Sequence, residues 1–330
     1  MSAIVAENLV KHFSPTIRAV DGVDLDVPEG QIFGYLGQNG SGKTTTVRML
    51  TTLLKPTSGR AEVNGIDVRR HPGHVRRTIG VALQEAGLDE LQTGRELLEL
   101  QASLFGMRGR KGHERAAELL RIVDLEEAAD RRIGGYSGGM RRRLDLAAAL
   151  VHRPKVVFLD EPTTGLDPVS RDAVWRYVRE LNSNDGVTFF LTTQYLEEAD
   201  RLADDLAIME AGKIIARGTP SELKASIGTD VVSVDIEGGR KAVARAAGIV
   251  QSLEGIERLQ TLEEGLVVYI AEGARAISRI VLLLDEANIV AGGITLARPT
   301  LDDVFLRMTG HHLLGEKAGA RPDGPKQETH

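Results

Sequence analysis

The sequence predicts an α/β domain with a largely parallel sheet, followed by a smaller α+β domain. Three observations support this fold class. Up to about Ala225, short apolar segments alternate with amphipathic ones, as in a parallel sheet covered by helices. A glycine-rich loop at residues 37–44 lies between an apolar strand and a segment with helical spacing. Beyond Gly218 the hydrophobic pattern changes to that of a small mixed domain.

The elements of the first domain follow from this alternation. Apolar runs predict strands at residues 31–36, 61–63, 79–83, 156–159, 188–191, 206–209 and 213–216. Helical spacing predicts helices at residues 45–50, 95–105, 114–123, 141–151, 171–182 and 196–202. We expect this domain to span residues 1–225.

The second domain is predicted at residues 226–312. Its pattern indicates strands at 231–236, 266–270 and 292–298, with helices at 242–247 and 276–285. A last amphipathic helix has Thr300 as its N-cap and ends at Gly310, with one apolar face made of Leu301, Val304, Phe305 and Met308. Residues 313–330 are rich in Gly, Pro and charge, so we expect a disordered tail.

The glycine-rich loop fits the phosphate-binding pattern G-x-x-x-x-G-K-[ST]. Its glycines let the backbone bend around a ligand, and successive N–H groups form a concave anion site. Lys43 suits the β- and γ-phosphates, the Thr44 hydroxyl is a usual oxygen ligand of Mg²⁺, and Thr45 continues into the helix. The expected cofactor-binding residues of this loop are Gly37, Gln38, Asn39, Gly40, Ser41, Gly42, Lys43, Thr44 and Thr45.

Two adjacent acidic residues follow another predicted strand. The apolar run at 156–159 ends in Asp160 and Glu161. Beside a phosphate loop, an Asp at a strand end completes the Mg²⁺ shell, and an acid after it can be the general base for an attacking water. The sequence therefore predicts nucleoside triphosphate hydrolysis, with Asp160 as a metal ligand and Glu161 as the base.

Between these two elements lies the segment Ser137-Gly138-Gly139, which opens a predicted helix and makes a second anion-binding helix N-terminus. These residues resemble the signature motif L-S-G-G-Q of ATP-binding cassette (ABC) ATPases. The resemblance covers roughly residues 4–225, and the order and spacing of the motifs agree. It implies a P-loop NTPase fold of the ABC type.

The resemblance also implies roles for residues outside the phosphate loop. Gln84 corresponds to the Q-loop glutamine, which contacts Mg²⁺ or the water, and residues 165–168 resemble the D-loop. Phe13 falls where such domains stack an aromatic ring on adenine, although a core aromatic beside the first strand is an equal alternative. Two such domains pair head to tail, so each ATP lies between the phosphate loop of one and residues 137–139 of the other.

One position departs from the family pattern. Most members have a histidine after the strand at 188–191, whereas this chain has Gln194. A glutamine amide can donate a hydrogen bond to a phosphate, but it carries no charge and moves no proton. Either the site hydrolyses ATP poorly, or Gln194 is an adequate switch because Glu161 keeps the base role. We favour the second interpretation because every other catalytic position is intact.

The motifs Tyr-Ser-Gly-Gly-Met-Arg-Arg-Arg and Thr-Thr-Gln-Tyr-Leu-Glu-Glu-Ala-Asp are similar to those of one subgroup, the ATPase subunits of daunorubicin/doxorubicin-resistance-type exporters. The resemblance implies a homodimer on the cytoplasmic face of the cell membrane. A separate integral membrane permease would export a hydrophobic compound, a drug or a lipid. We expect the permease to contact residues 84–131. Apolar docking positions are available there at Leu88, Leu91, Leu97, Leu98 and Leu100, although helical core is the alternative for most of them.

Composition agrees with a cytosolic protein. No run approaches the roughly 18–20 uncharged apolar residues of a membrane span, and no secretory signal is visible. The chain has no cysteine, which excludes disulfides and thiolate metal sites. A net charge of −6 argues against nucleic acid as a partner, although a soluble ABC ATPase acting on nucleic acid or the ribosome stays an alternative. A GTP switch is disfavoured because no Asn-Lys-x-Asp motif is found.

Overall fold

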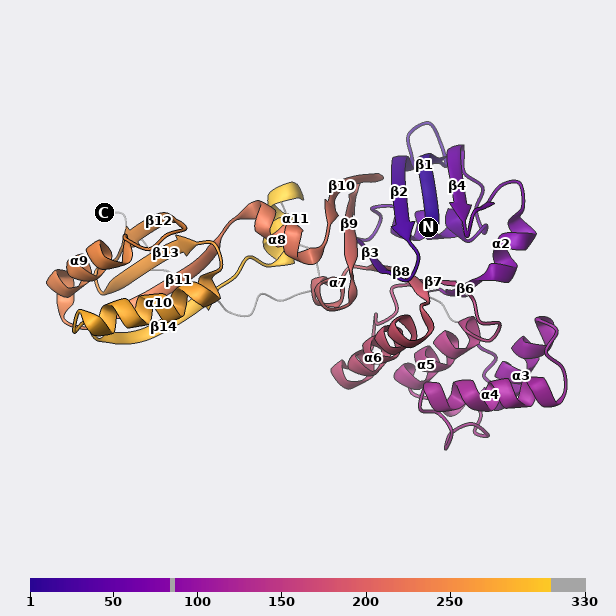
Figure 1. Cartoon of the computed structure of the whole chain (residues 1–330). Helices are drawn as coiled ribbons and strands as arrows, with labels where there is room; N and C mark the ends of the chain where they lie inside the picture. Colours follow the sequence, from indigo (N-terminus) through magenta and orange to yellow (C-terminus); the bar gives the residue numbers. More distant parts are fainter. Residues whose placement is uncertain (84–86, 310–330) are drawn as a thin grey trace, which may run out of the picture. The chain divides into compact units, whose positions relative to one another are not determined.

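The structure, a computed structural model, describes residues 1–83 and 87–309. The described residues form two compact units, one spanning Met1–Pro220 and one beginning at Ser221 (Figure 1). The first unit is built on a mostly parallel sheet, and the second is a small α+β unit. The predicted fold class is therefore confirmed.

The main sheet of the first unit has the strand order β10-β9-β3-β8-β7-β6. Its strands are β3 (Ile32–Leu36), β6 (Ile79–Ala82), β7 (Val156–Asp160), β8 (Thr188–Thr193), β9 (Asp205–Glu210) and β10 (Lys213–Gly218). All neighbours are parallel except β9 and β10, which form an antiparallel edge. The carboxyl ends of β3, β7 and β8 therefore meet at one edge of the sheet, where ligands bind in such folds.

A second sheet, which the sequence did not predict as a unit, is antiparallel with the order β2-β1-β4-β5. Its strands are β1 (Ser2–His12), β2 (Arg18–Pro28), β4 (Ser58–Val63) and β5 (Ile66–Asp67). Together with α1 (Lys43–Leu50), it encloses a core on one face of the main sheet. The aromatic side chains at the centre of that core are Phe33, Tyr35, Phe158 and Phe190.

The opposite face of the main sheet is covered by α3 (Gly94–Leu104), α4 (Arg110–Ile122), α5 (Gly138–Ala149) and α6 (Pro168–Asp185). α5 begins three residues before its predicted start at Arg141, because Ser137 caps it by accepting a hydrogen bond from the Met140 N–H at 3.2 Å. The shorter elements of this unit are α2 (Pro72–Thr78), the 3₁₀ turn η1 (Ile133–Gly135) and α7 (Leu196–Leu202).

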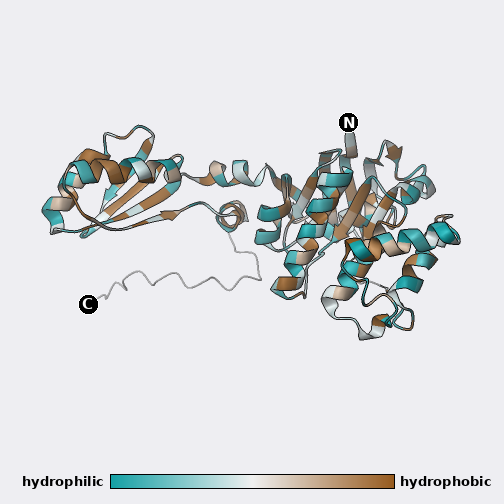
Figure 2. Ribbon diagram, turned by 60° about the horizontal axis from the view of Figure 1, so that its bottom comes forward, coloured by the Kyte–Doolittle hydropathy of each residue, from teal (hydrophilic) through white to brown (hydrophobic). Residues whose placement is uncertain are grey.

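The C-terminal unit has the order β11 (Asp230–Ile236), α9 (Gly239–Val250), β12 (Ile256–Thr261), β13 (Gly265–Ile270), α10 (Gly273–Glu286) and β14 (Ala291–Ala297). Its antiparallel sheet runs β12-β13-β11-β14, which is the βαββαβ arrangement of ferredoxin-like folds. Figure 2 shows hydrophobic residues along these strands, where they form a separate core. β12 was not predicted, because most of its side chains are polar and exposed.

Two further helices complete this unit, α8 (Pro220–Ile227) and α11 (Leu301–Thr309). Thr300 caps α11 as predicted, since its hydroxyl accepts from the Asp303 N–H at 3.2 Å. Leu301, Val304 and Phe305 are buried, whereas Met308 is exposed, so the apolar face is narrower than predicted. The predicted stop at Gly310 and the predicted tail lie outside the described residues.

We expect the central aromatic cluster to dominate the stability of the first unit. The Phe190 ring lies 5.4 Å from that of Phe33 and 5.6 Å from that of Phe158, with all three fully buried. Phe190→Ala should lower the free energy of unfolding by about 3–5 kcal/mol, because it removes the ring and leaves a cavity. Urea unfolding followed by fluorescence of the single tryptophan, Trp175, reports on this unit.

Phe13→Ala is the matched control. Phe13 is 57% exposed, so its removal should change stability by less than about 0.5 kcal/mol. Equal effects of the two substitutions would contradict the described core.

Candidate functional site

The phosphate-pattern loop connects β3 to α1, at the edge where the parallel strands end. Gly42 has φ 111°, and a Cβ there would lie 2.2 Å from the Ala19 carbonyl oxygen. A Cβ on Gly37 would lie 2.5 Å from the Met209 carbonyl oxygen. Both positions therefore require glycine, and the backbone approaches its neighbours too closely for any side chain.

Lys43 is buried at the start of α1. Its ammonium group donates to the carbonyl oxygens of Gly37 at 2.7 Å and Gln38 at 2.9 Å, and it lies 3.6 Å from the Glu161 carboxylate. Burial lowers the pKa of Lys43, and the charges of Glu161 and Asp160 oppose this shift. The loop thus curls around its own lysine and holds a positive charge at the edge of the sheet.

The loop also has groups that suit an anion. Ser41 is buried, and within the described residues its hydroxyl oxygen has no hydrogen-bond partner. α1 has no side chain capping its N-terminus, so the first backbone N–H groups are available to a ligand. Asn39 and Gly40 are exposed at the loop tip, and Thr45 is half-buried in the first turn of α1. An unsatisfied hydroxyl beside an uncapped helix end fits a phosphate group.

Asp160, the last residue of β7, lies beside the loop. Its Oδ1 accepts a hydrogen bond from the Thr44 hydroxyl at 3.2 Å and another from the Thr192 hydroxyl of β8 at 2.5 Å. Asp160 is almost fully buried, whereas Thr44 is half-buried. Two of the three side chains predicted as metal ligands are therefore in direct contact, and their oxygens suit Mg²⁺.

Glu161 follows in an unusual backbone conformation. Its φ of 47° is left-handed, a conformation that costs a non-glycine residue about 1–3 kcal/mol. Its N–H donates to both the carbonyl and the hydroxyl oxygen of Thr192, each at 3.1 Å, which fixes the turn. The Thr164 hydroxyl donates to the carboxylate at 3.2 Å, and Lys43 lies at its other oxygen. The strained turn holds the carboxylate against the phosphate loop.

The predicted site residues outside the phosphate loop and β7 lie on other elements of the unit. Ser137 and Gly138 are exposed, and Gly139 is buried against Ser170 with no room for a Cβ. Gln194 is half-buried directly after β8.

Phe13 is 57% exposed with Lys11 stacked on its ring, so the alternative that it is a core aromatic is wrong. Gln84 lies outside the described residues.

Arg142 is a site residue that sequence reasoning missed. From α5, its guanidinium donates to the carbonyl oxygens of Asp160 at 3.0 Å, Pro162 at 2.9 Å and Leu83 at 2.6 Å. Arg142 also forms an ion pair with Asp145 at 3.0 Å. Burial raises the pKa of Asp145 to about 6. Arg142 therefore ties the helix of the glycine motif to the end of β7 and to the residue before Gln84.

Glu198 is the second missed residue. It is fully buried in α7, and its Oε1 accepts hydrogen bonds from the Thr163 hydroxyl and the Trp175 indole N–H, both at 2.9 Å. Burial raises the pKa of its carboxyl group. Because α7 begins shortly after Gln194 and Thr163 comes shortly after Glu161, this carboxyl group connects the segments that carry these two residues. Its only signal in the sequence is an acid in an otherwise unremarkable helix.

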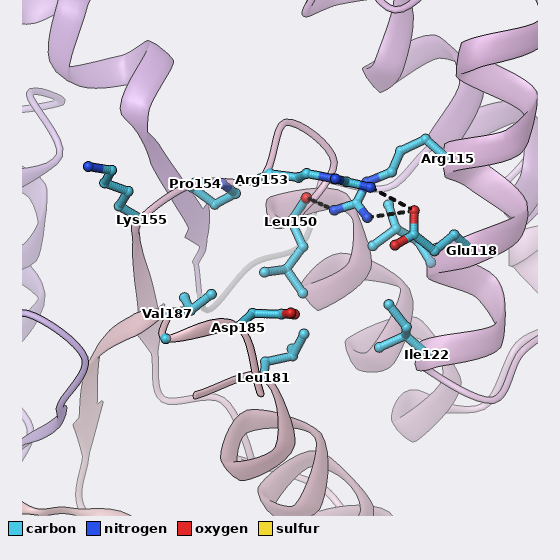
Figure 3. A pocket seen from close by; sticks show the side chains of 12 residues that line it. Arg115, Glu118, Ile122, Leu150, Arg153, Pro154, Lys155, Leu181, Asp185 and Val187 are labelled. Atoms are coloured by element: carbon cyan, nitrogen blue, oxygen red, sulfur yellow. Dashed lines mark hydrogen bonds and ion pairs between the residues drawn. The ribbon is translucent and has the colours of Figure 1, made fainter. Parts of the chain in front are cut away.

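A well-formed cavity of about 350 Å³ lies at the other end of α5 (Figure 3). Arg115 donates to the carbonyl oxygens of Leu150 at 2.6 Å and Val151 at 3.0 Å, and it pairs with Glu118 at 2.9 Å. The guanidinium thus caps the C-terminus of α5. Arg153 also pairs with Glu118, at 3.3 Å.

Comparison with known proteins agrees with this geometry. Residues 20–164 match the ABC transporter family. A daunorubicin resistance ATP-binding protein of Streptomyces coeruleorubidus is 46% identical over 96% of this chain and 98% of its own length. A daunorubicin/doxorubicin resistance ATP-binding protein of Streptomyces peucetius is 44% identical over 94% of this chain and 93% of its own. A Nod factor export ATP-binding protein of Cupriavidus metallidurans is 38% identical over 95% and 99%.

Solved structures of ATP-binding cassettes share the fold. One subunit of a Clostridium perfringens transporter complex has a TM-score of 0.63 and 26% identity, covering 68% of this chain and 91% of that chain. A cassette solved as a dimer bound to ADP and phosphate has a TM-score of 0.61 and 27% identity, covering 66% and 98%. In the part of this chain that the structure describes, none of the helices has the length and apolar character of a bilayer span.

This chain therefore belongs to the ATP-binding, ATP-hydrolysing subunits of ABC transporters, in the group of the daunorubicin/doxorubicin resistance ATP-binding proteins.

Proposed function

We propose that this chain hydrolyses ATP on the cytoplasmic face of the cell membrane and drives a separate permease subunit that exports a hydrophobic compound. The observation that carries this proposal is the contact of Lys43, Thr44, Asp160 and Glu161 at one edge of the sheet. A cation for phosphate, two oxygen ligands and a carboxylate are the parts that phosphoryl transfer to water needs.

Each residue then has one task. The backbone of residues 37–45 and the Ser41 hydroxyl bind the phosphates. The Lys43 ammonium group exchanges its hydrogen bonds to the loop carbonyls for contacts that neutralise the phosphate charge. Thr44 and Asp160 hold Mg²⁺, with Gln84 as the proposed third ligand. The metal, when bound, screens the charge on the β- and γ-phosphates. Glu161, fixed by its strained turn, accepts the proton of the attacking water.

The site is completed by a second copy of the chain. Ser137 and Gly138 are exposed at the N-terminus of α5, where a partner's nucleotide can reach their backbone N–H groups. A head-to-tail homodimer therefore places residues 137–139 of one copy on the ATP of the other. The solved cassette that is dimeric and bound to ADP and phosphate supports a dimer of this chain. Phe13 is exposed and free to stack on adenine.

A groove supports the permease contact. It has a volume of about 490 Å³ and is walled by exposed apolar side chains, including Leu53 at 56% exposure and Phe105 at 39%. Phe105 stacks on His152 at 3.9 Å, and burial lowers the pKa of that histidine, so its imidazole is uncharged near neutral pH. An exposed apolar groove of this kind suits an amphipathic helix of the membrane subunit.

The residues that line this groove differ in part from those predicted to contact the permease. Of the predicted leucines, Leu97 and Leu98 are buried in the core, although Leu97 and Leu88 also line the groove. Leu91 and Leu100 are exposed outside it. Segments before and after the predicted range contribute as well, including Leu53, Arg76 and His152.

The cargo is proposed from the relatives alone. Two of them are named for resistance to daunorubicin or doxorubicin and one for Nod factor export, so we propose a drug or lipid-like compound as cargo. Residues 1–225 form the nucleotide-binding domain in this proposal, and residues 226–312 form an accessory domain outside the catalytic site.

Glu161→Gln tests the base role. The amide keeps the shape of the side chain but accepts no proton, so ATP hydrolysis should fall by at least about 100-fold while ATP binding persists. Steady-state ATPase and equilibrium nucleotide binding are measured on the complex purified in detergent. Glu180→Gln, an exposed change on α6, is the control and should leave both unchanged.

The protein that co-purifies with the wild-type chain tests the rest of the proposal. A polytopic membrane protein supports the exporter, whereas ribosomes or DNA would support the alternative of an ABC ATPase without a transport partner. Unchanged hydrolysis by Glu161→Gln would overturn the base assignment.

Gln194→Ala tests the switch. If the amide donates a hydrogen bond to the γ-phosphate, its loss should lower kcat by roughly 10- to 100-fold, the range expected for a hydrogen bond to a charged group. Gln251→Ala, an exposed glutamine at the end of α9, is the matched control. If Gln194→Ala hydrolyses ATP as the wild type does, Gln194 does not contact the phosphate.

A further inference from the structure

A cluster of basic residues lies on the first unit and takes no part in the proposed catalysis. Residues 60–78 contain five arginines against two acids, in a chain whose net charge is −6. We call the arginines of this segment the basic patch; its members are Arg60, Arg69, Arg70, Arg76 and Arg77. All five are exposed: Arg60 lies on β4, and the other four lie on the turn after β5 and on α2.

Most of these charges are not neutralised within the chain. Arg60 pairs with Glu62, and Arg76 donates to the Thr52 hydroxyl at 2.9 Å. Arg69, Arg70 and Arg77 form no ion pair with any residue that the structure describes.

Asp67, the nearest acid in sequence, uses its Oδ1 to accept the backbone N–H groups of Arg69 and Arg70, each at 2.8 Å. That carboxylate fixes the turn and leaves both guanidinium groups directed to solvent.

Part of the basic patch surrounds a depression in the surface. A depression of about 680 Å³ is lined by Gly59, Arg60, Asp67, Arg69 and Arg70. A guanidinium group offers a planar fork of donors that matches phosphate oxygens, so arginines around a depression suit a phosphate headgroup better than lysines would.

Arg76 places the patch beside the permease groove. It belongs to α2 with Arg77, and it also lines the groove together with Leu53 and Ile79. Under the proposed function, the membrane subunit occupies this groove, so the patch lies on the side of the ATPase subunit that faces the membrane subunit. Basic clusters next to a membrane bind anionic lipids, each basic residue adding to the attraction.

We propose that the basic patch binds the headgroups of anionic phospholipids and holds this ATPase subunit against the membrane next to its permease. The inference rests on the proposed function, since the permease groove sets the position of the patch. Anionic lipid is favoured over nucleic acid because the patch lies beside the groove proposed for the membrane subunit.

Flotation of the full chain with vesicles tests the proposal. Vesicles of phosphatidylglycerol and phosphatidylcholine should bind the wild type, pure phosphatidylcholine vesicles should not, and added salt should weaken binding. The combined variant Arg69→Gln, Arg70→Gln and Arg77→Gln should weaken the vesicle partition coefficient by on the order of a hundredfold. Its ATPase activity in detergent should stay at the wild-type level.

A triple change with the same loss of charge controls for net charge. Arg258→Gln, Arg275→Gln and Arg279→Gln alter exposed arginines of the C-terminal unit and should leave vesicle binding unchanged. Binding by the patch variant equal to wild type, or equal binding of the wild type to neutral vesicles, would overturn the proposal.

Two other outcomes separate the inference from the function on which it rests. If the patch variant loses the co-purifying permease but keeps vesicle binding, the patch contacts an acidic protein segment and the lipid proposal is wrong. If the wild type hydrolyses ATP with its permease but does not bind anionic vesicles, the lipid inference fails while the proposed function stands.

Discussion

The site depends on the carboxyl end of β7. There, the Asp160 Oδ1 accepts hydrogen bonds from Thr44 of the phosphate loop and from Thr192 of β8, and the Asp160 carbonyl oxygen accepts one from Arg142 of α5. Three separate segments of the unit thus converge on one residue. Because parallel strands end at the same edge, the fold brings these groups together without any of them being near in sequence. A shift of this strand end would move Asp160 and Glu161 together and would change their contacts with Thr44 and Lys43.

The same strand end connects the site to the rest of the unit. Arg142 reaches from α5 to the carbonyl of Leu83, directly before Gln84, and Glu198 binds Thr163 just beyond the strand. A buried charged group without a hydrogen-bond partner costs free energy. Arg142 and Glu198 therefore hold their neighbours in a definite geometry. The exposed motif at residues 137–139, the groove lined by Leu83 and Asp145, and the end of β7 are therefore connected by hydrogen bonds. Under the proposed function, this connection is the route by which nucleotide binding reaches the groove.

Much of the first unit's fold and of the candidate site could be predicted from the sequence, because their signals are local. The phosphate loop needs glycine at fixed positions, and Asp160 and Glu161 follow directly after an apolar strand. Arg142 and Glu198 could not be assigned, because their roles depend on carbonyls and hydroxyls that only the tertiary fold brings close. The antiparallel sheet of β1, β2, β4 and β5 was missed as a unit because pairing between distant strands leaves no local pattern. Phe13 had two equal interpretations until its exposure removed the core alternative.

The central claim is that each ATP site is shared between two copies of the chain. Co-expression of a Lys43→Ala chain with a Ser137→Arg chain tests it most directly, because each homodimer lacks one half of both of its sites. A mixed head-to-tail dimer keeps one intact site, made of Lys43 from one chain and Ser137 from the other. The account predicts that the mixture hydrolyses ATP although neither variant does so alone. No activity from verified mixed dimers, or full activity of the Ser137→Arg chain alone, would contradict it.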